Sequence, residues 1–152
     1  GMALELALAA DIRLATADCI VGLPEIAFGI VPDVGGTTRL IRAVGAARAR
    51  ELILTGRLVR ARAAEPWGLV HGLAADEAEL GQLAAQRAAL LAGHPPAALR
   101  LAKTLCQAAA DADSATAFRF EGVVQQALLA QQDLARQFPA ALAFIKAQLA
   151  AC

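Results

Sequence analysis

Apolar residues recur at helical spacing throughout the second half of the chain. Leu80 and Leu83, three positions apart, belong to one such stripe, and Gly93 follows it as a stop signal. Pro139 should kink or restart the last helix, because proline cannot donate the hydrogen bond that a helix interior needs. Four helices are predicted here: residues 76–92, 95–110, 114–132 and 134–151.

The first half of the chain mixes shorter patterns. Ile12 and Leu14 alternate with Arg13, as expected of a half-buried strand. Thr55 and Gly56 end one helical stretch. The pattern predicts a buried helix over residues 2–10, helices over 37–44 and 46–54, a short element over 61–65, one or two short strands within 11–21, and a brief strand over 68–70. A few short strands are therefore expected in the first half of the chain, and almost only helices from about residue 77 onwards.

The segment between residues 22 and 37 is apolar but interrupted by glycine and proline. Pro24 fixes its own φ angle and biases the preceding residue towards extended geometry, so Glu25 should be presented from a bend. Gly35 and Gly36 are typical of a backbone that turns tightly or closely approaches another group. A carboxylate on such an apolar loop is costly to bury without a partner, which makes Glu25 a candidate functional residue.

Composition and charge exclude some classes of protein. The 152 residues include 14 basic and 14 acidic side chains, so no general attraction to nucleic acid is expected. No apolar run is long enough to cross a bilayer, and no membrane partner is predicted. The three cysteines, Cys19, Cys106 and Cys152, are widely separated and lack metal-ligand spacing, so we predict reduced thiols, a cytoplasmic location and no metal site.

Several motifs in order resemble one known superfamily. They are residues 5–13 (ELALAADIR), 22–25 (GLPE), 29–37 (GIVPDVGGT), 49–56 (ARELILTG) and 64–70 (AEPWGLV). Together these motifs resemble the crotonase superfamily of enoyl-CoA hydratases and isomerases. The resemblance implies an α/β fold, a remnant of the crotonase-like spiral with short strands. Residues 1–74 would be the C-terminal part of the crotonase core, and residues 75–152 a helical region of the trimerisation type.

The resemblance also implies a pair of catalytic acids. In the hydratases two glutamates at the spacing of Glu5 and Glu25 face one water beside the double bond of an enoyl thioester. One carboxylate takes a proton from the attacking water and a proton is delivered to the neighbouring carbon, help that is typically worth ~10²–10⁴-fold. The alternative is that Glu5 is an ordinary acid in the first turn of a helix and Glu25 a loop acid satisfied by backbone.

Other residues receive roles by the same resemblance. Met2 stands where a backbone N–H helps to bind the thioester oxyanion, although a frayed terminus is the simpler interpretation. Pro24, Ile30, Pro32 and Asp33 are expected to contact the substrate. For Asp33 a second interpretation is open, namely that it caps the helix that begins near Gly35.

Arginine is concentrated between residues 39 and 62. A face rich in arginine could steer the phosphates of CoA, or it could be a solvated surface or a subunit contact. The seven residues are Arg39, Arg42, Arg48, Arg50, Arg57, Arg60 and Arg62.

Three functions agree with these features. The first is syn addition of water to a 2-enoyl-CoA thioester, a lyase reaction whose only cofactor is the CoA of the substrate. The second is isomerisation of an enoyl-CoA, and the third is a non-catalytic oligomerising remnant. Family members normally carry a substantial segment before the motif that contains Glu5, so an N-terminally truncated chain with very low activity is expected. The acyl-CoA thioester is the expected partner, and a trimer or hexamer of this chain is the expected assembly.

Overall fold

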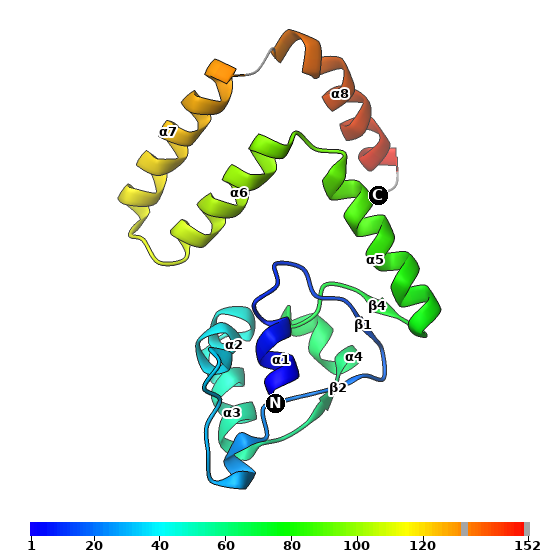
Figure 1. Cartoon of the computed structure of the whole chain (residues 1–152), viewed down its shortest axis with the longest axis vertical. Coiled ribbons are helices and arrows are strands. Elements are labelled where there is room, and N and C mark those ends of the chain that lie inside the picture. Colours follow the sequence, from blue (N-terminus) through cyan, green and yellow to red (C-terminus); the bar gives the residue numbers. More distant parts are fainter. Residues whose placement is uncertain (132–133, 151–152) are drawn as a thin grey trace. The chain divides into compact units, whose positions relative to one another are not determined.

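The computed structural model describes residues 1–131 and 134–150 and divides the chain into two compact units, Gly1–Ala89 and Leu90–Cys152. The first unit is built from short elements (Figure 1). They are α1 (Met2–Ala7), β1 (Ala15–Thr16), β2 (Ile20–Val21), the 3-10 helix η1 (Glu25–Phe28), α2 (Gly36–Val44), α3 (Ala46–Thr55), β3 (Val59–Arg60), α4 (Ala61–Ala64), the 3-10 helix η2 (Glu65–Trp67) and β4 (Leu73–Ala74). The helix α5 (Glu77–Ala92) runs across the boundary between the units.

The strands of the first unit form two separate pairs. β1 and β4 are parallel, with Ala15 opposite Leu73, whereas β2 and β3 are antiparallel, with Val21 opposite Val59. One or two short strands were predicted within residues 11–21, and two are present.

The strand predicted over residues 68–70 was wrong. Gly68 ends η2 in the left-handed conformation, and the strand that follows begins only at Leu73. Leu69 and Val70 are apolar because their side chains are buried in two different clusters, which does not require extended backbone.

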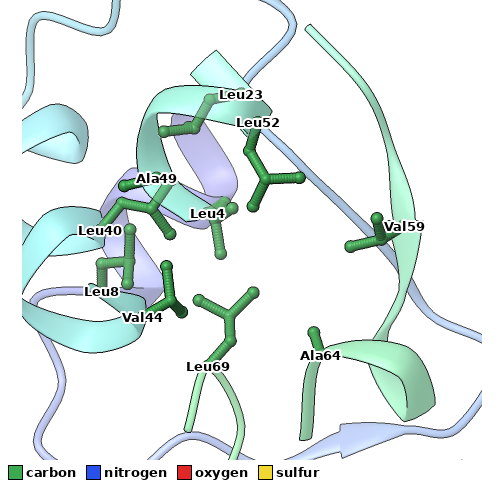
Figure 2. Packing of buried hydrophobic residues seen from close by; sticks show 10 residues of the cluster. All are labelled: Leu4, Leu8, Leu23, Leu40, Val44, Ala49, Leu52, Val59, Ala64 and Leu69. Atoms are coloured by element: carbon green, nitrogen blue, oxygen red, sulfur yellow. The ribbon is translucent and has the colours of Figure 1, made fainter. Parts of the chain in front are cut away.

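The main core lies among α1, α2 and α3 (Figure 2). Leu23, Leu40 and Leu52 are buried there. Leu40 and Leu52 lie on the apolar faces of α2 and α3, whereas Leu23 lies in the segment between β2 and η1. The ten buried residues of this cluster are Leu4, Leu8, Leu23, Leu40, Val44, Ala49, Leu52, Val59, Ala64 and Leu69. The helix predicted over residues 2–10 ends earlier, at Ala7, and it is buried on one side only, since Met2 and Leu6 are exposed.

Arg13 joins the segment after α1 to the loop before β4. Its guanidinium donates hydrogen bonds to the carbonyls of Leu69, at 2.6 Å, and Ala10, at 2.8 Å. Its backbone N–H donates to Nδ1 of His71 at 3.0 Å, and the N–H of His71 donates to the carbonyl of Arg13 at 2.7 Å. Two segments more than fifty residues apart in sequence are thereby fixed side by side.

The second unit contains the helices α6 (Pro96–Ala109), α7 (Ser114–Gln131) and α8 (Leu134–Ala150). α6 and α7 pack against each other (Figure 1), with Val124 buried. The four helices predicted for this half are confirmed within the described residues, and α8 continues through Pro139 rather than restarting there. None of the described helices is long and apolar enough to cross a membrane.

Candidate functional site

Glu5 is the most deeply buried charged residue of the first unit. It lies in the first turn of α1, and only 2% of its surface is exposed. Its Oε2 accepts hydrogen bonds from the backbone N–H groups of Val34, at 2.9 Å, and Gly36, at 2.7 Å. Gly36 is the first residue of α2, so the carboxylate occupies the N-terminal end of that helix, where unpaired amides and the helix dipole favour an anion.

Gly35 and Gly36, the N-cap and the first residue of α2, are glycines for different structural reasons. Gly35, the N-cap, has φ 86°, a left-handed conformation that L side chains rarely adopt. Gly36 instead lies directly against the carboxylate, since a Cβ atom there would be 2.5 Å from Cγ and 2.6 Å from Oε2 of Glu5. The glycine pair therefore gives Glu5 access to the amides of the turn.

Asp33 is not the cap of α2. The N-cap is Gly35, which provides no side-chain hydrogen bond, and Asp33 is exposed. Glu5 performs the capping from another part of the chain. The interpretation of Asp33 as a third carboxylate near the substrate stays a prediction.

Glu25 begins η1 directly after Pro24, which is the N-cap of that turn. Only 12% of its side chain is exposed, and its Oε2 has no hydrogen-bond partner among the described residues. Oε1 lies 3.8 Å from the amino nitrogen of Gly1. Most buried polar atoms in proteins are hydrogen-bonded, so a buried carboxylate oxygen without a donor calls for an explanation, and a catalytic role is one.

Gly1 links the two glutamates. Its carbonyl accepts a hydrogen bond from the N–H of Glu5 at 3.2 Å and another from Leu4 at 2.8 Å, as in a first helical turn. Its amino nitrogen faces Glu25 and also donates to the carbonyl of Gly22. Both predicted acids therefore lie around the N-terminal turn of α1.

The structure distributes the remaining predicted site residues along the same loop. The N–H of Ile30 donates to the carbonyl of Glu25 at 3.3 Å, and the side chain of Ile30 is exposed. Pro24 is half-buried and Pro32 is buried. Met2 is the first residue of α1, and fraying of this terminus stays a prediction. A backbone N–H at that position has no acceptor within its own helix.

Most of the clustered arginines have partners of their own. Arg57 donates to both carboxylate oxygens of Glu51, at 2.7 and 2.9 Å, and the guanidinium of Arg48 lies 5.0 Å from the ring centre of Trp67. Arg60 and Arg62 both bind Asp18. Much of the arginine-rich stretch is thus engaged in surface contacts.

Sequence reasoning missed two of these relationships. Asp18 is separated from Arg60 by 42 residues, and no spacing rule connects them. His71 lies in the loop before β4, 58 residues from Arg13 in the sequence. It is exposed, but it pairs with Arg13 through two hydrogen bonds.

Across the described residues no group of three or more His, Cys, Asp or Glu side chains could hold a metal ion. Cys19 and Cys106 are free and exposed, and Cys152 lies outside the described residues.

Comparison with known proteins identifies the family. The family profile described as enoyl-CoA hydratase/isomerase matches residues 1–146. The chain belongs to this family. It is 39% identical over 117 residues to the short-chain-enoyl-CoA hydratase of Clostridioides difficile, covering 77% of this chain and 75% of that protein. It is 41% identical over 127 residues to the human mitochondrial enoyl-CoA hydratase domain-containing protein 2, covering 81% of this chain and 43% of that protein.

Solved structures of the family have the same fold. An enoyl-CoA hydratase from Bacillus anthracis superposes with a TM-score of 0.85 at 34% identity, over 90% of this chain and 53% of that chain. A protein of Thermobifida fusca YX in complex with CoA superposes with a TM-score of 0.82 at 38% identity, over 86% of this chain and 51% of that chain. The predicted crotonase-like α/β fold is confirmed, and the chain spans about half the length of most of these relatives.

Proposed function

We propose that this member of the enoyl-CoA hydratase/isomerase family has the site of a hydratase, which adds water to a 2-enoyl-CoA thioester. The observation that carries the proposal is the placement of Glu5 and Glu25 around one helical turn, each with its carboxylate largely removed from solvent. An isomerase site needs only an acid at the position of Glu25, so the presence of both glutamates favours hydration.

The geometry suggests a role for each acid. Both amide hydrogen bonds to Glu5 go to Oε2, so Oε1 takes part in neither. In the proposed reaction Glu25 enters in its protonated form, and the carboxylate of Glu5 accepts a proton as the water oxygen bonds to C3 of the substrate. The electrons of the double bond move towards the thioester oxygen and then form the bond between C2 and the proton that Glu25 delivers. Loss of the proton from Glu5 to solvent and uptake of one by Glu25 restore the starting state. The product gains one hydroxyl group and one hydrogen, which together are the elements of water.

The substrate class and its contacts are part of the same proposal. An acyl-CoA thioester is supported by the family and by the CoA complex of the Thermobifida fusca protein. We propose that Pro24, Ile30, Pro32 and Asp33 contact the acyl group. The N–H of Met2 is proposed to stabilise the oxyanion of the thioester, and no cofactor other than the CoA of the substrate is required.

Hydration of crotonyl-CoA tests the proposal, because it consumes the conjugated double bond and can be followed by ultraviolet absorbance. Glu25→Gln retains the shape of the side chain and removes its titrating proton, so the rate should fall by at least about 10²-fold. The hydration rate of Glu5→Gln should fall by a similar factor. Glu51→Gln, which changes an exposed glutamate paired with Arg57, is the matched control and should retain the parent rate.

The assay should compare the 152-residue chain with a version extended upstream. We propose that the 152 residues alone turn over very slowly, because they span only about half the length of most of the relatives in this family. Equal rates in Glu25→Gln and Glu51→Gln would reject the assignment of Glu25. Absence of hydration in both lengths would favour the non-catalytic alternative.

Self-association is proposed for the helices of the second unit. Large apolar side chains are exposed there, including Phe118, at 70%, and Leu149, at 71%. Exposed apolar area of this kind is typical of protein interfaces, and a trimer or hexamer is the proposed state in the cytoplasm. Light scattering at micromolar concentration should detect the oligomer, and a monodisperse monomer would contradict the proposal.

A further inference from the structure

The turn that binds Glu5, residues 34–36, also binds a second side chain, that of Arg39. The N–H groups of Val34 and Gly36 point to the carboxylate of Glu5, as described above. The carbonyl of Val34 accepts a hydrogen bond of 2.7 Å from Nη1 of Arg39. The backbone of Val34 is therefore fixed at both ends, its N–H by a carboxylate and its C=O by a guanidinium.

Arg39 also packs against the glycine between those two amides. A Cβ atom on Gly35 would lie 2.7 Å from Nη1, 3.0 Å from Cζ and 3.4 Å from Nη2 of Arg39. Three guanidinium atoms that close to one point show that the group covers Gly35. The turn consequently has Arg39 against one glycine and Glu5 against the next.

The position of Arg39 is not explained by helix stability. It lies in the first turn of α2, where its N–H bonds to the carbonyl of Gly35 at 3.0 Å. A positive charge near a helix N-terminus interacts unfavourably with the helix dipole. The contact with residues 34–36 explains why an arginine occupies position 39.

We propose that Arg39 is a positioning residue for Glu5. By binding the carbonyl of Val34 and covering Gly35, it keeps the amides of Val34 and Gly36 in the orientation that Oε2 of Glu5 requires. The inference rests on the proposed function, because the catalytic role of Glu5 belongs to that function. Placement matters at such a site, since a displacement of about 1 Å can lower a rate by about 10²-fold.

Amide hydrogen exchange tests the proposal without any need for activity. Arg39→Met removes the donor and retains much of the length, whereas Arg39→Lys retains a cationic donor. Arg50→Met is the matched control, since Arg50 is exposed on α3 and has no hydrogen-bond partner among the described residues. In Arg39→Met the amides of Val34 and Gly36 should exchange about 2- to 10-fold faster, the factor that corresponds to one hydrogen bond.

Three comparisons make the exchange result decisive. The amide of Leu52, in the neighbouring helix α3, should exchange at the parent rate in Arg39→Met, which separates a local effect from a loss of global stability. Arg39→Lys should restore part of the protection, and Arg50→Met should resemble the parent protein. Unchanged exchange at both Val34 and Gly36 in Arg39→Met would overturn the proposal.

Kinetics on a version that hydrates crotonyl-CoA test the second half of the inference. Arg39→Met should lower kcat by about 10-fold or more with KM within about 2-fold, because Glu5 is displaced while the substrate contacts are retained. Arg39→Lys should recover part of kcat. A kcat equal to that of Arg50→Met would overturn the positioning role. If no version hydrates crotonyl-CoA, the proposed function fails, and the exchange experiment still decides whether Arg39 holds the turn.

Discussion

A Cβ atom at position 36 would lie 2.6 Å from Oε2 of Glu5. That separation is shorter than carbon and oxygen atoms tolerate without a bond between them, so an alanine requires Glu5 or the turn to shift. Because Glu5 is buried and bound to two amides, neither can move without losing a hydrogen bond.

Gly36→Ala should therefore destabilise the chain by about 1–3 kcal/mol, the usual cost of overpacking. The free energy of unfolding in urea measures the effect. Gly81→Ala is the control, because Gly81 lies within α5 and nothing is near its missing Cβ. That variant should be more stable by about 0.5–1 kcal/mol, the gain from replacing glycine inside a helix. Equal urea midpoints for Gly36→Ala and the parent would contradict the close approach.

Leu52 and Leu54 provide a matched pair on α3. Leu52 is 1% exposed and belongs to the main core, whereas Leu54 is 71% exposed. Leu52→Ala should cost about 2–5 kcal/mol, since it removes buried methyl groups and leaves a cavity. Leu54→Ala should change the stability by less than about 0.5 kcal/mol. Chemical denaturation of both variants checks the core, and similar losses would mean that Leu52 is not in it.

The pair of Arg13 and His71 predicts a dependence of stability on pH. Partial burial of the ring and then the positive charge of Arg13 lower the pKa of His71. Nδ1 also accepts the hydrogen bond from Arg13, which requires the neutral ring. Below the ordinary histidine pKa of about 6.5 the unfolded chain binds a proton more readily than the folded chain. The stabilising contribution is therefore complete above that pH and decreases as the pH falls.

Unfolding measured at pH 8, 6.5 and 5 should show this decrease. The effect should remain below about 1 kcal/mol, because the interaction is exposed to solvent. His71→Asn retains an acceptor that does not titrate and should flatten the dependence over this range. His94→Asn, which leaves the Arg13–His71 pair intact, should keep the parent slope. A parent slope retained in His71→Asn would assign the effect to other groups.

Removing the charge of Asp18 should have almost no effect on the free energy of unfolding. It binds both Arg60 and Arg62, but 65% of its side chain is exposed, and so are about half of each arginine. Exposed ion pairs contribute about 0–1 kcal/mol, so Asp18→Asn should lower the free energy of unfolding by less than about 1 kcal/mol. The difference should shrink further at high salt. A loss of several kcal/mol would show that this contact organises the β2–β3 pair.

The longer helices were predictable from the sequence because each is long enough for its apolar spacing to repeat. The two-residue strands are different, since a period of two cannot be recognised in two residues. Leu69 and Val70 consequently resembled a strand, although their side chains are apolar because they enter two clusters.

Candidate site residues could be proposed from the sequence where they belong to a motif, whereas the contacts around them depend on residues distant in sequence. Glu5 and Glu25 were identified by resemblance, and the bend after Pro24 followed from proline geometry. The capping of α2 by Glu5 was not predicted, because local signals favoured Asp33 and the two partners are 31 residues apart. The contact between Arg39 and the carbonyl of Val34 was missed too, since nothing in the sequence shows which way the turn faces.

The unpaired Oε2 of Glu25 places the stability of the fold in opposition to the catalytic role that we propose for this residue. Leaving a buried polar oxygen without a donor costs about 1–3 kcal/mol, so an apolar residue of similar size at this position should give a more stable fold. Directed evolution that rewards only expression or heat resistance would then tend to replace Glu25 early. A library built from this chain therefore needs a selection for turnover from its first round. Otherwise its most stable members will lack the acid that we propose for proton transfer.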